Sequence, residues 1–313
     1  MSKDTAIVTG GAGFIGSHLA AELLKRGYKV IILDDLSTGK RGNIEPILAQ
    51  GNIQFTEGSI TDLSLLNKLF QNIDFIFHLA AIPSVPRSVE NPLTSHNVNL
   101  TGTLNVLLAA KDNKVKKVIY ASSSAVYGDT PTLPKREDMP PDPKSPYAVT
   151  KLAAEYYCQT FYEVFGLPTI CLRYFNVYGL GQDPGSQYAA VIPNFIARFL
   201  ENKPPIIFGD GEQTRDFTFV KDAIEANILA AEKDTTGVFN IGTGKKVSIN
   251  ELARLITEIT GRDVRPIYRE PRPGDIKHSL ADISKAKQFG YNPKYNLEEG
   301  LRETIGSFKW LTS

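Results

Sequence analysis

The stretch Thr9-Gly10-Gly11-Ala12-Gly13-Phe14-Ile15-Gly16 decides the fold of this chain. It follows a short apolar run, residues 5–9, which is typical of a buried strand, and it opens a helical pattern that continues to Arg26. Glycines at 10, 13 and 16 allow a tight turn and a close approach of the backbone to a pyrophosphate at the start of the helix. The stretch therefore predicts a strand-loop-helix unit that binds a dinucleotide.

An acidic residue at the end of the next predicted strand indicates which dinucleotide is bound. Asp34 follows the apolar run 29–33. A carboxylate at this place can accept hydrogen bonds from the adenosine ribose, and it would repel a 2′-phosphate. We therefore expect NAD rather than NADP.

The first half of the chain continues the alternation of strands and helices. Further strands are predicted at 53–56, 75–79, 117–120 and 169–173, and further helices at 63–70, 93–111 and 147–165. Nearly continuous apolar strands separated by helices are typical of a parallel sheet covered on both faces. Residues 1–175 are thus expected to form a doubly wound α/β domain of the Rossmann type.

Residues 176–313 lack a repeated strand-helix period. Helices are predicted at 192–200, 221–232 and 249–260, the last one capped by Ser248, and strands at 238–241 and 267–269. We expect a smaller α/β lobe that binds the substrate. Residues from about 217 to 241 are expected to return to the first domain, so the boundary near 175 is approximate.

Composition and charge exclude several classes of function. The 313 residues carry a net charge of +1, which gives no electrostatic basis for binding nucleic acid or an anionic membrane. The two cysteines, Cys158 and Cys171, are expected to be buried free thiols, and the four scattered histidines form no metal-ligand pattern. Asp4 removes the basic region that would precede a signal peptide, and glycines, His18 and Glu22 interrupt the apolar segment 5–24, so we do not expect this segment to be a signal peptide. We expect a cytoplasmic protein that crosses no membrane and needs no metal.

The segment Pro146-Tyr147-Ala148-Val149-Thr150-Lys151 contains a candidate proton-transfer device. A tyrosine four residues before a lysine on a helix places both side chains on one face, within reach of one ligand. The ammonium of Lys151 would favour the phenolate of Tyr147, so the tyrosine could act as a base closer to neutral pH. The same pattern also arises from a half-buried tyrosine beside a solvated lysine, and the other motifs decide between the two.

Five further motifs stand in the order that one known family shows. They are Leu79-Ala80-Ala81, Asn99-Leu100-Thr101-Gly102-Thr103, Ser122-Ser123-Ser124-Ala125-Val126-Tyr127-Gly128, Tyr147-x-x-x-Lys151 and Arg173-Tyr174-Phe175-Asn176. Together with the spacing of the N-terminal glycines, they make the whole chain resemble the extended short-chain dehydrogenase/reductase family. Within that family, the chain looks most like the UDP-sugar 4-epimerases.

The resemblance implies a set of binding residues. NAD is expected to contact Gly10, Gly13, Phe14, Ile15, Gly16, Asp34, Asp35, Ser37, Thr38, Gly39, Ser59, Ile60, Leu79, Ala80, Ala81, Asn99, Tyr147, Lys151 and Phe175. A UDP-sugar is expected to contact Ser84, Ser123, Ser124, Tyr147, Asn176, Ala190, Val191, Ile207, Phe208, Arg215, Arg272, Asp275 and Ser279. In this set the two arginines supply planar donors for a diphosphate, and Asn176 is expected to donate to it as well.

The resemblance also implies the reaction. Tyr147 would take the proton of the sugar 4-hydroxyl, Ser123 would hydrogen-bond the same oxygen, and Lys151 would hold the nicotinamide ribose and keep the pKa of Tyr147 low. NAD would take the hydride from C4 and return it to the other face of a transient 4-keto sugar. Sugar-nucleotide dehydratases carry an acidic pair where this chain has Ser124 and Ala125, so dehydration lacks its acid and base.

The prediction of which sugar is bound depends mainly on Ser279. Epimerases restricted to glucose resemble one another in a bulky tyrosine at this place, whereas Ser279 and the small Ala190 leave room for an N-acetyl group. We expect UDP-N-acetylglucosamine to be at least as good a substrate as UDP-glucose. A UDP-glucuronate 4-epimerase or decarboxylase remains an alternative, for which Arg87 is the candidate carboxylate site, although capping of the following helix is the favoured role of Arg87.

The chain departs from the family pattern in two places, and two other classes of function stay open. Ser59 stands where an acid usually contacts the adenine, with Asp62 following, and Pro83 replaces a lysine found in some epimerases. A reductase that releases NADH, or a redox sensor without catalysis, would use the same fold. Family members often dimerise through the helices at about 93–111 and 147–165, so a homodimer is expected.

Overall fold

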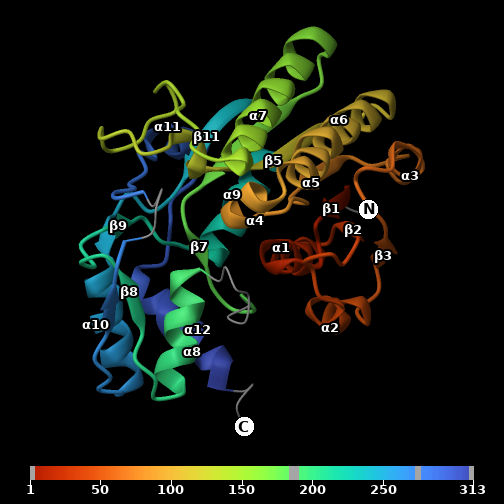
Figure 1. Ribbon diagram of the computed structural model, residues 1–313. Helices are drawn as coiled ribbons and strands as arrows, with labels where there is room; N and C mark the ends of the chain where they lie inside the picture. The colour runs from red at the N-terminus through yellow and green to blue at the C-terminus, as the bar shows by residue number, and fades with distance from the viewer. Residues whose placement is uncertain (1–3, 183–189, 272–275, 310–313) are drawn as a thin grey trace.

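A seven-stranded parallel sheet forms the centre of the protein (Figure 1). The computed structural model describes residues 4–182, 190–271 and 276–309. The strand order is β11-β6-β5-β4-β1-β2-β3, and every neighbouring pair is parallel. Along the chain, the strands are β1 (Thr5–Thr9), β2 (Lys29–Asp34), β3 (Ile53–Glu57), β4 (Phe75–His78), β5 (Lys117–Ser123), β6 (Thr169–Tyr174) and β11 (Gly237–Ile241).

The order of the strands positions the site. The chain runs from β1 outward to β2 and β3, and then returns to the other side of β1 as β4. At such a reversal the loops after the two neighbouring strands diverge, which opens a crevice at their carboxyl ends. Gly10 follows β1 and Leu79 follows β4, so the glycine-rich stretch lies at this crevice.

Helices cover both faces of the sheet because alternate side chains of each strand point to opposite sides. Ala6 and Val8 of β1 pack in one apolar cluster with Leu19 of α1, whereas Ile7 packs in another with Val106 of α6. The helices that precede β6, together with the later α9, are α1 (Phe14–Lys25), α2 (Glu45–Leu48), α3 (Leu63–Leu69), α4 (Val85–Glu90), α5 (Pro92–His96), α6 (Gly102–Asp112), α7 (Pro146–Phe165) and α9 (Val220–Glu232). Shorter helical turns are η1 (Arg41–Asn43), η2 (Asn97–Thr101) and η3 (Ser124–Tyr127).

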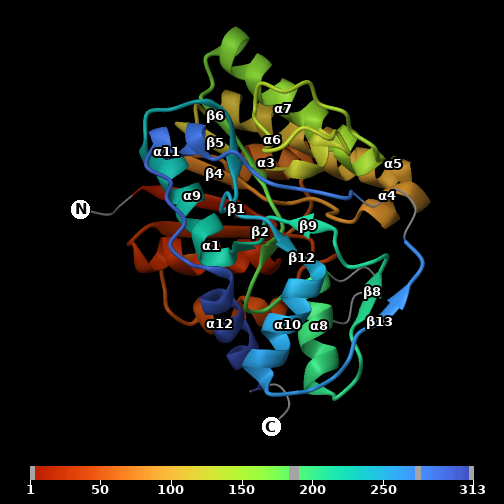
Figure 2. The ribbon, with the colours of Figure 1, turned by 90° about the vertical axis from the view of Figure 1, so that its left-hand side faces the viewer.

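Short strand pairs and most of the remaining helices lie beside the carboxyl edge of the sheet, whereas the short helix Ser284–Gln288 packs against β11 (Figure 2). The pairs are β7 (Val177–Tyr178) with β10 (Thr218–Phe219), β8 (Ile206–Phe208) with β13 (Ile267–Arg269), and β9 (Thr214–Arg215) with β12 (Val247–Ser248). The helices are α8 (Val191–Leu200), α10 (Ile249–Thr260), α11 (Ser284–Gln288) and α12 (Leu297–Lys309).

The doubly wound α/β fold expected from the sequence is confirmed. The predicted helix 93–111 is found as α5, the π-helical turn η2 and α6, which follow one another without a break. The helix α12 and the two-residue strands were not predicted. β11 pairs with β6 in the main sheet, as a returning segment requires, while the division into two domains near residue 175 stays a prediction. Within the described part of the chain, no helix is long and apolar enough to cross a membrane.

Candidate active site

The first turn of α7 places the predicted catalytic tyrosine. Ser145 caps this helix by accepting a hydrogen bond from the backbone N–H of Ala148, and Pro146 occupies the first helical position, where no N–H is needed. The backbone N–H of Tyr147 donates to the Ser88 hydroxyl of α4 at 3.1 Å. Local sequence and one contact to α4 therefore fix where the helix begins.

Tyr147 lies against Ser123 at the end of β5. The Ser123 side chain hydrogen-bonds the Tyr147 phenol and lowers its pKa, but burial outweighs this contact and raises the pKa of Tyr147 overall. The expectation that the pKa of Tyr147 is held low was therefore wrong. The contact brings Ser123 and Tyr147 together, while their joint action on one sugar oxygen stays a prediction.

Lys151 lies one turn further along α7 and is buried. Its ammonium group donates a 2.8 Å hydrogen bond to the backbone oxygen of Ala121 and lies 5.9 Å from the centre of the Tyr147 ring. Burial lowers the pKa of Lys151 to about 8, although nearby Glu155 opposes this shift. The lysine is therefore held in place by β5 and carries a charge that is sensitive to mildly alkaline pH.

The glycine-rich loop is shaped by close backbone contacts. A Cβ atom at Gly16 would lie 2.2 Å from the Gly10 carbonyl oxygen, and Gly10 itself has a φ of +70°. Gly13 precedes α1, whose first backbone N–H groups have no partner within the helix and carry the positive end of its dipole. This helix start, which contains no acidic residue in its first turn, fits the pyrophosphate of a dinucleotide.

Asp34, at the end of β2, lies beside the glycine-rich loop and lines the same site. Its carboxylate accepts hydrogen bonds from the backbone N–H groups of Ala12 and Leu36, at 2.9 and 2.8 Å. Burial raises the pKa of Asp34, and these two donors oppose that shift. Two donors do not saturate the oxygens of a carboxylate, so Asp34 can still accept from a ribose hydroxyl.

One large cavity of about 820 Å³ joins these groups. From the predicted NAD-binding set it is lined by Gly10, Gly13, Phe14, Ile15, Gly16, Asp34, Asp35, Ser37, Thr38, Ile60, Leu79, Ala80, Ala81, Tyr147 and Lys151. From the predicted substrate set it is lined by Ser123, Ser124, Asn176, Ala190, Arg215 and Ser279. The glycine-rich loop, the Tyr147 helix and part of the predicted sugar site thus share one space.

Four predicted NAD ligands do not line the large cavity. Gly39 packs against Asp34, where an added Cβ would lie 2.8 Å from the carboxylate. Ser59 pairs with Thr61, and its neighbours Gly58 and Ile60 line the cavity instead. Phe175 is fully buried beside the Tyr127 ring, and Tyr174 takes its place.

Asn99, the fourth of these residues, has a structural role in the loop after β4. It accepts from the backbone N–H of Ile82 at 2.7 Å and donates to the Thr150 hydroxyl at 3.2 Å. Asn99 thereby connects the loop after β4 to α7 without facing the cavity.

Ser84 and Arg87 also differ from their predicted places. Ser84 caps α4 by accepting from the N–H of Arg87, while Pro83, Val85 and Pro86 line the cavity. Arg87 is exposed on α4 and does not line the cavity. Asn91, rather than Arg87, caps the following helix α5, so the favoured capping role of Arg87 was wrong, and its role as a carboxylate site stays a prediction.

A smaller adjoining cavity of about 280 Å³ contains the rest of the predicted substrate set. Val191, Ile207 and Phe208 line it, together with Asn176, Ala190 and Arg215, which line both cavities. The side chain of Asn176 donates to the backbone oxygen of Asp216 at 3.2 Å, which uses one of the two N–H groups of its amide, so its donation to a diphosphate stays a prediction. Arg272 and Asp275 lie outside the described residues.

Several lining residues were missed by the sequence analysis. In the large cavity these include Lys40, Asn43, Val98, Tyr174, Gln182 and Ile276, and in the smaller one Phe195, Gln213, Phe217 and Ile249. Gln213 and Phe217 flank the Thr214-Arg215-Asp216 motif, so adjacency to that motif was a usable signal. Among the described residues, no group of three or more histidines, cysteines or acids is placed to hold a metal ion.

Comparison with known proteins identifies the family. Residues 6–242 match the model of the NAD dependent epimerase/dehydratase family. The chain belongs to this family. NAD is accordingly its cofactor, and the residues around the large cavity fit that molecule: a free helix start for the pyrophosphate and Asp34 for the ribose.

Solved structures of similar epimerases extend this family assignment. A UDP-N-acetylglucosamine 4-epimerase from Methanobrevibacter ruminantium, in complex with UDP-N-acetylmuramic acid, is 45% identical with a TM-score of 0.96, covering 99% of this chain and 100% of that one. A UDP-glucose 4-epimerase from Thermotoga maritima with UDP-glucose is 41% identical with a TM-score of 0.95, covering 99% and 100%. A UDP-glucuronic acid 4-epimerase from Bacillus cereus, with UDP-glucuronic acid and NAD, is 38% identical with a TM-score of 0.91, covering 98% and 99%. All three of these similar proteins are named 4-epimerases, and they differ in the sugar named.

Proposed function

We propose that the protein is an NAD-dependent UDP-hexose 4-epimerase that interconverts UDP-N-acetylglucosamine and UDP-N-acetylgalactosamine as well as UDP-glucose and UDP-galactose. The observation that carries the proposal is the shared space of the two cavities. Tyr147 and Ser123 line the large cavity beside the glycine-rich loop, and Arg215 lines both cavities. A nucleotide sugar lying across Arg215 would bring its sugar toward Tyr147 and its base into the smaller cavity.

Each residue of the site has a separate role in the proposed reaction. Tyr147 exchanges a proton with the 4-hydroxyl of the sugar, and Ser123 supports it by hydrogen-bonding the phenol. Lys151, held by Ala121, places a positive charge beside Tyr147, and this charge would oppose the rise in the Tyr147 pKa that burial causes. When bound, NAD supplies the acceptor and donor of the hydride at C4. Arg215 and the start of α1 hold phosphates on either side of the reacting carbon.

Ser279 supports the wider sugar range. Its side chain is small, largely buried, and lines the large cavity together with Ala190. The backbone N–H of Ser279 donates to Thr214 at 3.0 Å, which fixes this segment beside Arg215. An N-acetyl group at C2 would therefore meet a hydroxymethyl group rather than an aromatic ring.

A uronate-specific enzyme of the same family is the second candidate. The UDP-glucuronic acid 4-epimerase is similar in fold, with a TM-score of 0.91. A sugar carboxylate, however, needs a cation that has no other role in the site. Among the described lining residues of the large cavity, the cations are Lys40, Lys151 and Arg215. Lys40 belongs to the loop beside Asp34, and the other two have roles above, so the uronate alternative is the weaker one.

A homodimer in the cytoplasm is part of the proposal. The helices α4, α5 and α7 contact one another, and apolar side chains stand out from this face, among them Val89, Leu93 and Tyr156. Leu93 is 81% exposed. A second copy of the chain packed on this face would remove these side chains from water.

The test of the proposed function is direct conversion. Purified protein is incubated separately with UDP-N-acetylglucosamine, UDP-glucose and UDP-glucuronate, and the nucleotide sugars are separated by chromatography. The proposal expects the C4 epimers of the first two. Conversion of UDP-glucuronate alone would support the second candidate and contradict the first.

A further inference from the structure

A buried carboxylate on α7 lies directly behind the proposed catalytic pair. Glu155 follows Lys151 by one helical turn, as Lys151 follows Tyr147, so the three side chains lie along one side of the helix. The Glu155 side chain is 1% exposed, and it does not line either cavity. A carboxylate withdrawn from water at this depth is costly unless it is fully paired.

Two neighbouring strands supply the partners of Glu155. Arg173 of β6 donates to both carboxylate oxygens, through Nε at 2.9 Å and Nη2 at 2.7 Å, in the two-pronged geometry that suits a guanidinium. The Ser122 hydroxyl of β5 donates to the same carboxylate. Glu155 therefore connects α7, which carries Tyr147 and Lys151, to the residue of β5 that directly precedes Ser123.

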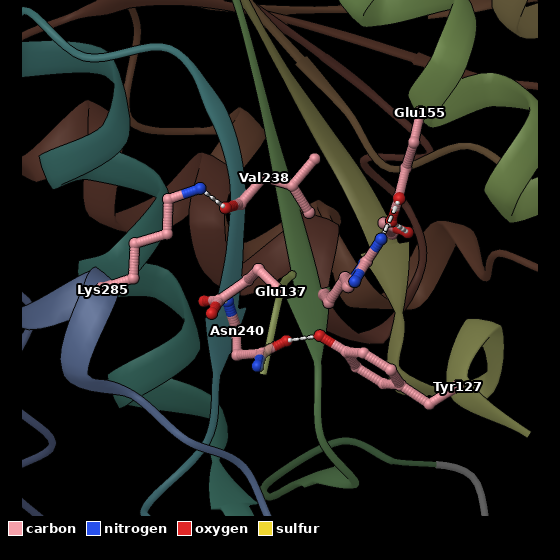
Figure 3. Close-up of polar contacts among 8 residues, drawn as sticks. Tyr127, Glu137, Glu155, Val238, Asn240 and Lys285 are labelled. Carbon is pink, nitrogen blue, oxygen red and sulfur yellow. Dashed lines mark hydrogen bonds and ion pairs between the residues drawn. The ribbon is translucent and has the colours of Figure 1, made fainter. Parts of the chain in front are cut away.

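The arginine is held from its other side, so the connection is rigid. The Arg173 guanidinium lies 4.7 Å from the centre of the Tyr127 ring. Tyr127 in turn donates a 2.7 Å hydrogen bond to the Asn240 side chain, whose backbone N–H donates to Glu137 (Figure 3). Figure 3 shows Glu155 on one side of this group and Asn240 with Glu137 on the other, across the strands of the sheet.

We propose that Glu155 is a positioning residue for the epimerisation: it fixes α7 against β5 so that Ser123, Tyr147 and Lys151 keep their places, and it maintains the positive charge of Lys151. The inference rests on the proposed function, because the reaction assigned to Tyr147 and Lys151 is what Glu155 would support.

The charges around Lys151 agree with this role. The titratable and charged groups that face Lys151 or the ion pair of Glu155 with Arg173 are Tyr147, Glu155 and Cys158 from α7, His78 from β4, Tyr120 from β5, and Cys171 and Arg173 from β6. Burial lowers the pKa of Lys151 to about 8, and Glu155 is the foremost of the groups that oppose this shift. Loss of the carboxylate would therefore lower the pKa of Lys151 further.

The first test is the pH dependence of a variant that keeps the shape of the side chain. Glu155→Gln retains most atoms of the contact and removes the negative charge. We expect kcat to fall roughly tenfold more at the alkaline end of the profile than at neutral pH, with KM for the UDP-sugar changing much less. The matched control is Glu225→Gln, which removes an ion pair to Arg26 between α9 and α1, away from Lys151. The control is expected to lose stability without a change in the pH profile.

The second test distinguishes an effect of Glu155 on catalysis from an effect on the stability of the fold alone. In Glu155→Gln/Arg173→Met no unpaired guanidinium remains, and replacement of a buried ion pair by uncharged groups is often tolerated by a fold. The double variant is expected to regain thermal stability over Glu155→Gln while keeping the altered pH profile. A return of the native profile in the double variant, or a native profile in Glu155→Gln, would overturn the inference. Absence of epimerisation in the native protein would instead overturn the proposed function, and this inference with it.

Discussion

The ammonium group of Lys151 donates a 2.8 Å hydrogen bond to the backbone oxygen of Ala121, two residues before Ser123 on β5. This contact ties the lysine of α7 to the strand that carries the serine facing Tyr147. It also holds the lysine in a buried place, which lowers its pKa to about 8.

The first prediction concerns pH. Lys151 supports the reaction in its charged form, and it loses its proton as the pH rises through about 8. We expect kcat to decline above that pH, as measured from initial rates across a pH series with saturating UDP-sugar. A rate that stays level well into the alkaline range would show that the charge of Lys151 is not needed.

The second prediction concerns the proposed base. Tyr147→Phe removes the phenol and the hydrogen bond to Ser123, and it leaves the ring in place. We expect kcat to fall by about 10²-fold or more, with little change in the melting temperature. Tyr156→Phe, on the exposed side of the same helix, is the control and should keep native activity.

The third prediction concerns the sugar. Ser279→Tyr places a ring where the large cavity has a hydroxymethyl group. The ratio of kcat/KM for UDP-N-acetylglucosamine to that for UDP-glucose is expected to fall at least about tenfold. Ser279→Ala, which adds no bulk, should leave the ratio near its native value. If Ser279→Tyr turned over UDP-N-acetylglucosamine as fast as the native protein, Ser279 would not be the residue that lets the site accept acetylated sugars.

The fourth prediction compares two glycines. An alanine at Gly16 would bring its Cβ to 2.2 Å from the Gly10 oxygen, so the loop at the start of α1 must shift. Gly16→Ala is expected to weaken NAD binding, measured by calorimetry, and to lower the melting temperature. Gly306→Ala in α12 meets nothing within 4 Å and should stabilise the protein by about 0.5–1 kcal/mol through helix propensity. If the two substitutions had equal effects on NAD binding and on the melting temperature, the close contact between Gly16 and the Gly10 oxygen would be contradicted.

The fifth prediction concerns assembly. Leu93→Glu puts a charge on the apolar face of α4, α5 and α7, where Leu93 is 81% exposed. Sedimentation velocity should find the native protein as a dimer and the variant as a monomer, because an unpaired charge is costly at a buried interface. A native protein that sediments as a monomer would rule out this dimer.

Long elements with strong local signals could be predicted from the sequence. The helix 249–260 and its cap Ser248 are found as predicted, because the cap and the apolar spacing act within the segment itself. The helix α12 was missed although Leu297, Leu301 and Ile305 follow helical spacing. Strands of two residues, such as β7 and β10, depend on partners far along the chain, and no local pattern indicates them.

The site was predictable where a side chain faces the cavity from the end of an element. Tyr147 and Lys151 are of this kind, since their spacing on one helix fixes the direction of their side chains. The glycines were predictable for another reason, because the tight loop needs residues without a Cβ atom. Asn99 and Phe175 belong to the same motifs, but they point into the packing between elements, which only the tertiary structure decides. The raised pKa of Tyr147 was missed for a similar reason, because the sequence indicates its neighbours but not how deeply it is buried.

The most direct test of the account is proton NMR of the purified protein with UDP-N-acetylglucosamine and, separately, UDP-glucose, each with and without added NAD, while NADH absorbance is recorded. The account predicts that both C4 epimers appear and that no net NADH accumulates, because the hydride taken from C4 is returned to the same carbon. Stoichiometric NADH with no epimer would contradict it and would identify a reductase that releases its cofactor.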